Sequence, residues 1–467
     1  MLTEGVDYAD AGKSTHDNVA DTFKFTDASE TITATFAQLS KGDQLIDLSN
    51  ADNDTLALSL DINNVKQTIG SKNGATLVNI EELDITSRGA KNITFDNTIS
   101  AAGLKTIKIA GSFLNEKGND GNGFTFNGNV LKTLTTIDAS AITAGNVNID
   151  ASKATQDLTI TGSNFAASIN GGSGNDTITG QGTINAGAGD DIITITGKSD
   201  VTGGEGKDTF DVQAGKVTIT DLGDGKDIIK VAAGAEVTAT VTGQFVVSES
   251  NYVNDGSVTF KVATDGVLDL SEADGNITSI EITGTGAEVV GTVGDDTITV
   301  GSGASGTVEG GEGDDTITLA SGHAATTIVF AANAAANGED TITNFTAGSN
   351  GDKLNISAFT TKAGQLKTAD ASSASLEVGS TNSIGVLFKD DDGKITASDV
   401  VTSSASNGQI QVASGEKAVV LVTNATSASA GGLYNIYYIT GGDTATVELV
   451  GNVTTTAAAL TLDDNFA

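Results

Sequence analysis

The chain has 467 residues, of which 60 are acidic and 24 are basic, so its formal charge is −36 at pH 7. This charge argues against nucleic acid or anionic lipid as a main partner, because phosphate groups repel such a surface, and it favours multivalent cations instead. The absence of cysteine excludes disulfide bonds, zinc–thiolate sites and thiol nucleophiles.

Short apolar strands are expected in the first third of the chain, where the pattern apolar-x-x-apolar-x-apolar recurs. It reads IEELDI at 80–85, LKTIKI at 104–109 and LTTIDA at 134–139, and shorter forms follow at 147–149 and 158–160. Asparagine, threonine and serine fill the intervening turns. A threonine-rich series of short, irregularly spaced strands favours a parallel β-solenoid over a β-sandwich.

A nine-residue pattern, Gly-Gly-x-Gly-x-Asp-x-apolar-x, organises the next segment. It reads GGSGNDTIT at 171–179, AGAGDDIIT at 186–194, GGEGKDTFD at 203–211 and LGDGKDIIK at 222–230. The aspartates at its sixth position are spaced by 15, 17 and 19 residues and are Asp176, Asp191, Asp208 and Asp227. These spacings scatter around two nonapeptides, so we expect one such motif in each full coil of the chain.

A second block of the same pattern follows. It reads GTVGDDTIT at 291–299 and GGEGDDTIT at 310–318, and a looser copy, NGEDTI, lies at 337–342. Its sixth-position aspartates are Asp296, Asp315 and Asp340. Similar segments close the two blocks, TITDL at 218–222 and TITNF at 341–345, and ITSIEI at 277–282 precedes the second block. A module of coils, repeat block and closing strand is therefore expected twice.

The pattern changes from about residue 360, where alanine, serine and threonine replace most glycines. The segments KAVVLV at 417–422, LYNIYYI at 433–439 and TVELV at 446–450 alternate enough to predict antiparallel strands, with Gly-Gly turns at 431–432 and 441–442.

The nonapeptide suits calcium. Glycine permits the tight turn and lets carbonyl oxygens face a cation, and aspartate adds a hard, charged oxygen ligand. Stacked coils would bring successive aspartates to about 5 Å, where two carboxylates repel by about 1 kcal/mol in water and about 3 kcal/mol at an effective dielectric of 20. The blocks are therefore expected to stay unfolded until several Ca²⁺ ions neutralise them. The predicted metal-site residues are Asp176, Asp191, Asp208, Asp227, Asp296, Asp315 and Asp340, with the turn glycines Gly172, Gly174, Gly187, Gly189, Gly204, Gly206, Gly311 and Gly313.

Other interpretations of the acidic segments are weaker. A glycine-rich acidic linker could contain one such motif, but an isoleucine or phenylalanine two residues beyond each aspartate in repeated copies argues against it. The segments DDDGKI at 390–395 and EADGNI at 272–277 resemble the middle of an EF-hand loop. In both, the first ligand position is apolar, so acidic turns are the favoured interpretation.

The repeat blocks resemble RTX proteins, which are exported by type I secretion with an uncleaved C-terminal signal. The segments GDQLIDL at 42–48, ATLVNIEELDI at 75–85 and LTTIDAS at 134–140 resemble RTX-type bacterial S-layer proteins, and YYITGGDTATVELVG at 437–451 is similar to their secretion domains. The expected fold is all-β: a right-handed parallel β-solenoid with calcium-binding RTX β-roll segments and a C-terminal antiparallel β region. The expected segments are an N-terminal solenoid (1–165), a first RTX block (166–235), intervening coils (236–285), a second RTX block (286–362) and a C-terminal domain with the secretion signal (363–467).

An enzyme is the main competing class, because RTX blocks often follow a catalytic domain. The sequence contains neither an HExxH motif nor a GxSxG motif, and its two histidines, His16 and His323, cannot supply a three-histidine zinc site. His323 is expected to be a solvent-facing turn residue. The absence of tryptophan, which often stacks on sugars, also disfavours a glycosidase. We therefore expect no catalysis.

The sequence thus predicts a calcium-dependent, self-assembling S-layer protein located outside the cell at its surface. Its expected partners are further copies of itself, a cell-surface polysaccharide or lipopolysaccharide, and the type I secretion machinery. Nucleic acid is not expected, nor is a membrane span, because no apolar run approaches about 18 residues. An RTX adhesin or biofilm-matrix protein remains the alternative, and a secreted enzyme that carries RTX repeats is less favoured.

Overall fold

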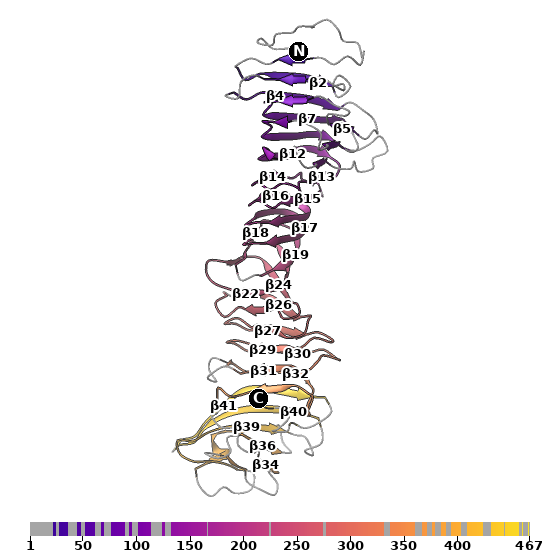
Figure 1. Ribbon diagram of the computed structural model, residues 1–467. Helices are drawn as coiled ribbons and strands as arrows, with labels where there is room; N and C mark the ends of the chain where they lie inside the picture. The colour runs from indigo at the N-terminus through magenta and orange to yellow at the C-terminus, as the bar shows by residue number, and fades with distance from the viewer. Residues whose placement is uncertain are drawn as a thin grey trace. The chain divides into compact units, whose positions relative to one another are not determined.

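The structure is a computed structural model of the chain, and Figure 1 shows its strands. It describes residues 22–24, 28–35, 44–47, 52–60, 67–69, 76–88, 93–95, 101–113, 124–126, 132–165, 167–223, 226–273, 277–330, 337–359, 367–370, 376–378, 384–388, 394–402, 409–423, 431–442, 444–456, 460 and 466. Strands dominate these residues, and a short 3-10 helix, η3, spans Ala397–Asp399. In this part of the chain, no helix has the length and apolar character needed to cross a membrane.

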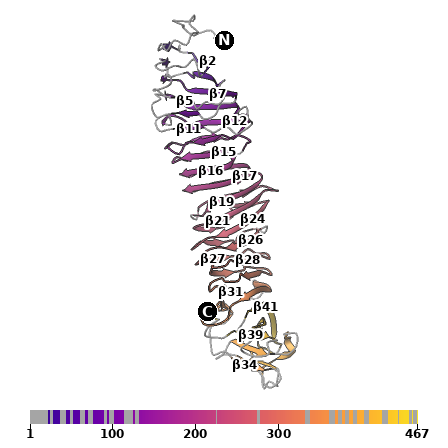
Figure 2. The same ribbon diagram turned by 90° about the vertical axis from the view of Figure 1, so that its right-hand side faces the viewer.

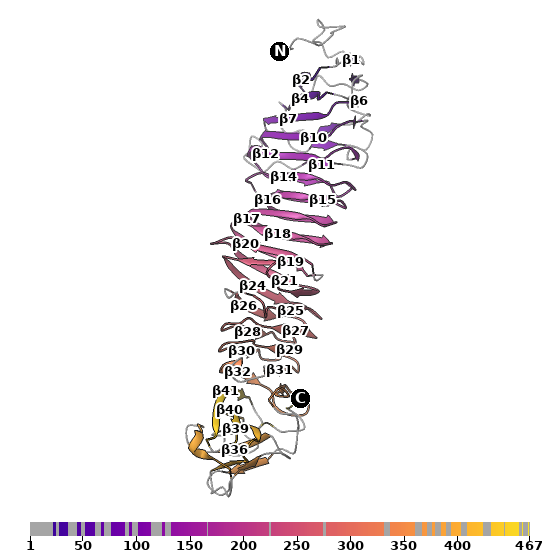
Figure 3. The same cartoon turned by 90° about the vertical axis from the view of Figure 1, so that its left-hand side faces the viewer.

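The chain forms two compact units. The first contains Met1–Asp221 and Lys226–Val237, and the second contains Leu222–Gly225 and Thr238–Ala467. Within each unit, parallel strands lie one above another in successive layers, as the two side views show (Figures 2 and 3). The aspartates of the first repeat block belong to the first unit, and those of the second block belong to the second unit.

One row of parallel strands, named row A, runs through the first unit. Successive strands of row A pair in parallel, and each places one apolar residue directly over the next in the register. The strands are β2 (Thr31–Thr35), β4 (Thr55–Leu60), β7 (Glu82–Arg88), β10 (Thr106–Ser112), β12 (Thr136–Ala144), β14 (Thr159–Thr161), β16 (Thr177–Ala188), β17 (Ile192–Glu205), β18 (Thr209–Val212) and β20 (Ile228–Val231).

Two further rows of parallel strands complete the first unit. Row B contains β5 (Gln67–Ile69), β8 (Ile93–Phe95), β11 (Phe124–Phe126), β13 (Asn148–Asp150), β15 (Ala167–Gly172) and β19 (Lys216–Leu222), and the second halves of β16 and β17 continue it. Row C contains β1 (Thr22–Lys24), β3 (Gln44–Ile46), β6 (Thr76–Val78) and β9 (Ala101–Ala102). One turn of the chain through these rows is called a coil below.

A column of stacked apolar side chains forms the core of row A. In a strand such as β16, Ile178 points inward and is fully buried, whereas Thr177 beside it is exposed, because side chains alternate along a strand. The register stacks equivalent residues of successive coils, so each inward side chain covers the next. This column consists of Ile32, Leu56, Leu83, Ile107, Ile137, Ile160, Ile178, Ile193, Phe210 and Ile229, all at most 6% exposed.

The second unit repeats this arrangement with two rows. Row D contains β24 (Ser257–Val262), β26 (Ile277–Ile282), β28 (Thr297–Val300), β30 (Thr316–Leu319) and β32 (Asp340–Phe345). Row E contains β22 (Gln244–Val246), β25 (Val267–Asp269), β27 (Ala287–Val290), β29 (Gly306–Glu309), β31 (Thr327–Val329) and β33 (Lys353–Asn355). Two more strands are β21 (Glu236–Val241) and β23 (Tyr252–Asn254).

The C-terminal strands belong to two sheets and pair both in parallel and antiparallel, which partly corrects the predicted antiparallel region. The three predicted strands are present as β39 (Lys417–Thr423), β40 (Leu433–Thr440) and β41 (Thr446–Thr455), and they pair antiparallel. However, β34 (Lys367–Asp370), β36 (Ile384–Phe388) and β39 pair in parallel, as do β35 (Leu376–Val378), β37 (Val400–Val401) and β38 (Ile410–Val412). Alternation predicts a strand but does not determine the direction of its partner, which explains the error.

The C-terminal segment covers the last strand of both rows of the second unit. Strand β41 pairs in parallel with β32, the last strand of row D, and Phe466 forms a bridge with Leu354 in β33, the last strand of row E. Unpaired strand edges favour association with other chains, so this arrangement protects the end of the stack. The all-β and mostly parallel character predicted from the sequence is confirmed and is consistent with a β-solenoid.

Candidate metal sites in stacked carboxylates

The four aspartates of the first repeat block form a stack in the first unit, called the first ladder. Each lies directly before its row A strand and is at most 4% exposed. The N–H of Asp176 donates to Oδ1 of Asp191 (2.7 Å), that of Asp191 donates to Asp208 (3.0 Å), and that of Asp208 donates to Asp227 (3.0 Å). Each carboxylate therefore satisfies a backbone donor of the preceding coil, and the predicted stacking of these aspartates is confirmed.

The aspartates of the second repeat block form an equivalent stack, the second ladder. The N–H of Asp296 donates to Oδ1 of Asp315 (2.8 Å), and that of Asp315 donates to Oδ1 of Asp340 (3.2 Å). Asn337 donates from Nδ2 to Oδ2 of Asp340 (2.8 Å) and to the carbonyl of Val450 in β41 (2.9 Å). The end of this ladder is thus attached to the C-terminal strand that covers row D.

A second series of side chains caps the turns on their exposed side and runs in the opposite direction. The N–H of Asn175 donates to Oδ1 of Asp157, the N–H of Asp190 donates to Oδ1 of Asn175, and the N–H of Lys207 donates to Oδ1 of Asp190, all at 2.8 Å. The residue just before each buried aspartate is therefore also held by the neighbouring coil. Asp295 and Asp314 accept in the same way in the second unit, from Asp314 and Glu339.

The turn glycines are required by the close approach of successive coils. Six of the predicted glycines have φ between 104° and 126°, a region that favours glycine: Gly187, Gly189, Gly204, Gly206, Gly311 and Gly313. A Cβ on Gly204 would collide with the carbonyl oxygen of Gly187 in the preceding coil. Gly172 and Gly174 lack a positive φ, but a Cβ there would also strike the preceding coil, at Ala154 and Gln156.

The glycine at the first motif position was missed by sequence reasoning, although the motif contains it. At Gly171 and Gly291, a Cβ would lie 2.5 Å and 2.7 Å from Oδ2 of the aspartate in the same motif. At Gly203 and Gly310 it would collide with the equivalent oxygen. Glycine therefore makes room for the buried carboxylate in these four copies.

Burial and neighbouring acids raise the pKa of the ladder aspartates. Desolvation is the largest cause for Asp191, whose pKa rises to about 7, and Asp208, Asp176 and Asp190 raise it further. Desolvation also raises the pKa of Asp315 to about 8, with further contributions from Asp340, Asp296 and Asp295.

The same effect is found for three further ladder aspartates. Desolvation raises the pKa of Asp340 to about 7, and it raises the pKa of Asp176 and Asp296 above the ordinary value of 3.8. Backbone N–H donors oppose the shift in each of these three groups but do not cancel it. Each ladder therefore favours a bound proton or a bound cation over bare charge.

One oxygen in each ladder is available to a cation. Oδ2 of Asp191 and Oδ2 of Asp315 are buried and accept no hydrogen bond from the described part of the chain. A carboxylate oxygen of this kind is a hard ligand of the type that calcium prefers. The fold thus positions acidic oxygens in register, which is the property that a row of calcium ions would require.

A third ladder in the N-terminal coils was not predicted. The N–H of Glu30 donates to Oδ1 of Asp54 (2.9 Å), and the N–H of Asp54 donates to Oε2 of Glu81 (3.0 Å). These acids lie directly before β2, β4 and β7, in the same position as the repeat-block aspartates, and all are at most 8% exposed. No glycine motif surrounds them; the only sequence signal is an acid immediately before an apolar-alternating strand.

The prediction that His323 faces solvent is wrong. Its side chain is 5% exposed, and its Nε2 lies 2.9 Å from Oδ2 of Asp352, which is fully buried. Its Nδ1 lies 2.8 Å from the carbonyl oxygen of Ala320. Both ring nitrogens therefore lie against oxygen atoms, one of a carbonyl and one of a buried carboxylate. The 29 residues between the partners concealed this pair in the sequence.

The two EF-hand-like segments fall partly outside the described residues, which omit 389–393 and 274–276. Comparison with protein-family models gives no match for this chain, and comparison with curated proteins gives none either. The function must therefore be argued from the ladders themselves.

Proposed function

We propose that this protein is a calcium-dependent, self-assembling surface-layer protein with a right-handed β-solenoid fold and RTX-type β-roll segments. The observation that supports the proposal is the in-register stacking of buried carboxylates. The charged residues that raise the pKa values of Asp191 and Asp315 are themselves acids. Such a stack is unstable as bare charge, and divalent cations of the class that prefers hard oxygen ligands would neutralise it.

The mechanism is ionic. In a cell interior with little free calcium, repulsion between the aspartates keeps the coils open, so an extended chain can pass through a type I exporter. Outside the cell, calcium at about 10⁻⁴–10⁻³ M matches the affinities that are typical of extracellular calcium modules. Binding then stabilises the folded coils by mass action, and it assembles copies of the chain into a layer on the cell-surface polysaccharide or lipopolysaccharide.

Calcium-dependent folding is tested with the double variant Asp191→Ala plus Asp208→Ala. We expect this variant to need at least tenfold more calcium than the unchanged protein to reach the folded circular dichroism spectrum. The matched control is Asp190→Ala, which removes a neighbouring but exposed acid and should leave the calcium requirement nearly unchanged. Equal calcium requirements in all three proteins would refute the role of the ladder.

Assembly is tested separately by electron microscopy of the purified full chain in millimolar calcium and then in chelator. Two-dimensional sheets that dissolve on chelation are the expected result. Monodisperse particles in calcium would contradict self-assembly and would favour an adhesin, even if the ladders bind calcium.

A further inference from the structure

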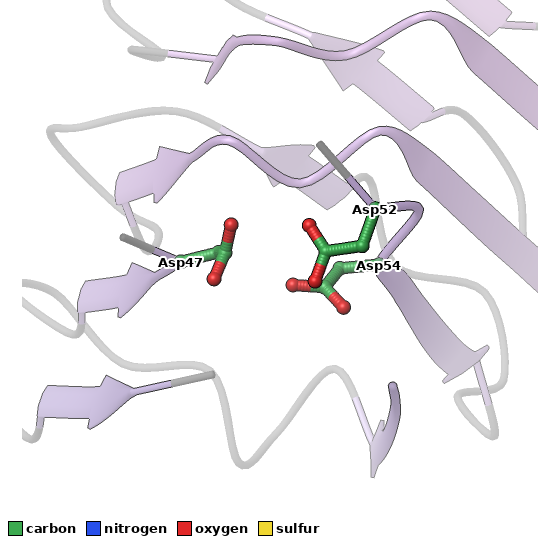
Figure 4. Close-up of side chains that lie close together, drawn as sticks. All are labelled: Asp47, Asp52 and Asp54. Atoms are coloured by element: carbon green, nitrogen blue, oxygen red, sulfur yellow. The ribbon is translucent and has the colours of Figure 1, made fainter. Parts of the chain in front are cut away.

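Three aspartates meet where the chain passes from row C to row A in the N-terminal coils. Asp47 directly follows β3, and Asp54 directly precedes β4, with Asp52 two residues before it. One carboxylate oxygen from each of the three lies within 4.8 Å of the others. Figure 4 shows that the carboxylate of Asp47 faces those of Asp52 and Asp54 across a short gap.

Backbone contacts hold two of these residues in place. The N–H of Asp47 donates to the carbonyl of Val78 (3.0 Å), and Asn79 donates from Nδ2 to the carbonyl of Asp47 (3.2 Å). The N–H of Asp54 donates to Glu81, and Oδ1 of Asp54 accepts the N–H of Glu30. The backbone of Asp47 and the carboxylate of Asp54 are therefore held by neighbouring coils, independently of any ion.

Three carboxylate oxygens, two from Asp52 and one from Asp54, have no hydrogen-bond donor among the described residues. Asp54 is fully buried, and its Oδ2 accepts no hydrogen bond from any described residue. Both carboxylate oxygens of Asp52 are also buried and accept none within the same part of the chain. A buried carboxylate oxygen without a donor is costly, so such an arrangement indicates a positively charged ligand.

The charged residues around Asp54 also favour a positively charged ligand. Three other acids, Asp47, Asp52 and Glu30, act on the charge of this buried carboxylate. Every charged neighbour that shifts this group is an acid. A positive ligand among these side chains would relieve both the desolvation and the mutual repulsion.

We propose that Asp47, Asp52 and Asp54 bind one calcium ion. Calcium accepts several carboxylates in a flexible coordination shell, which suits three aspartates that each place one oxygen within 4.8 Å of the others. Magnesium usually keeps several waters and takes only one or two carboxylates, so a set of three disfavours it. An all-carboxylate set also disfavours zinc, which prefers nitrogen and sulfur ligands. The ion joins the end of β3 to the start of β4.

This site is independent of the repeat blocks, since none of its residues belongs to a nonapeptide. The test uses the full chain and measures bound calcium per chain by equilibrium dialysis in 1 mM calcium. The test variant is Asp52→Asn plus Asp54→Asn, because asparagine at position 54 keeps an oxygen that can accept the Glu30 N–H. The control is Asp138→Asn, an acid in the same unit whose Oδ1 accepts the N–H of Ser140.

We expect the double variant to bind one calcium ion fewer than the unchanged protein, with the same circular dichroism spectrum, and the control to lose none. Dialysis against magnesium alone should show no such difference between the proteins. An unchanged calcium count in the double variant overturns the proposal, and so does a magnesium count that drops by one. Loss of ions only in the Asp191→Ala plus Asp208→Ala variant would support the ladders while refuting this site.

Discussion

Buried carboxylates occur in two different settings in this protein. In the second unit, Asp352 is fully buried and is paired with the imidazole of His323, and its oxygens also accept the N–H groups of Thr326 (2.9 Å) and Thr346 (2.7 Å). In the ladders, Asp191 and Asp315 are equally buried, but the charges that act on their pKa values come from neighbouring aspartates.

This difference indicates what the ladders lack. Where the chain supplies an imidazole together with backbone donors, as it does for Asp352, both oxygens of the buried carboxylate have partners. Where it supplies only backbone donors, the negative charge must be neutralised by a proton or by an ion from solution. We therefore expect the stability of the ladders to depend on solvent composition, and that of the Asp352 region to depend on it much less.

The largest effect is expected from the close approach of successive coils at the turn glycines. Gly204→Ala places a side chain at a φ of 113° and drives its Cβ into the carbonyl oxygen of Gly187. We expect a loss of at least about 4 kcal/mol in the free energy of unfolding, or failure to fold, even in saturating calcium. Chemical denaturation in calcium measures this loss.

The matched control is Gly234→Ala, because Gly234 has a φ of 82° but no atom within 4 Å of the added Cβ. It should cost only about 1 kcal/mol, the cost of the strained backbone conformation. Equal losses in the two variants would show that close approach between coils does not determine the glycine positions.

The next effect distinguishes the internally paired carboxylate from the ladders. His323→Gln removes the imidazole that lies against both oxygens of the buried Asp352, so we expect the free energy of unfolding to fall by about 1–3 kcal/mol, and calcium should not restore it. Urea denaturation with and without calcium measures this. Adding Asp352→Asn to His323→Gln should recover part of the loss, since no buried charge then remains. If calcium fully restored the stability of the His323→Gln variant, the carboxylate of Asp352 would depend on calcium in the way that we propose for the ladders.

The ladders also predict a pH dependence in chelator. The pKa of Asp191 is raised from 3.8 to about 7 and that of Asp315 to about 8, so the folded state binds protons more tightly than the unfolded state. Their contribution to stability is therefore complete below about pH 4 and is lost as the pH rises through 7 to 8. The folded fraction in EDTA, measured by circular dichroism, should fall between pH 5 and pH 8, and saturating calcium should remove most of this decline. A folded fraction that rises over this range in EDTA contradicts the ladder electrostatics.

The sequence predicted features that repeat at short range and missed those that depend on distant segments. The nonapeptides located Asp176 and its equivalents, and the apolar residues two positions beyond them, such as Ile178, are fully buried in one column as expected. The third ladder, which contains Asp54, lacks the glycines from which the sequence predicted the other two ladders. Its longer coils place successive acids 24 and 27 residues apart, so no repeat length revealed them.

Other features could not be read from local pattern at all. His323 and Asp352 become partners only because successive coils stack, and the Asp47 cluster forms only because the ends of β3 and β4 meet. The partner direction of β36 is likewise set by the fold, since the same alternation suits parallel and antiparallel pairing.

The smallest effect is expected from a comparison of two adjacent acids, the exposed Asp190 and the buried Asp191 of the first ladder. Asp190→Asn changes an exposed acid and keeps an oxygen for the N–H of Lys207, so its free energy of unfolding should change by less than about 0.5 kcal/mol. Asp191→Asn also keeps an oxygen that can accept the N–H of Asp176, but it removes a buried charge. In EDTA at pH 8 it should therefore be more stable than the unchanged protein, while gaining less stability from calcium. Thermal unfolding of both variants in EDTA and in calcium makes this comparison. If calcium stabilised Asp191→Asn as much as it stabilises Asp190→Asn, the calcium requirement could not be assigned to the buried carboxylate of Asp191.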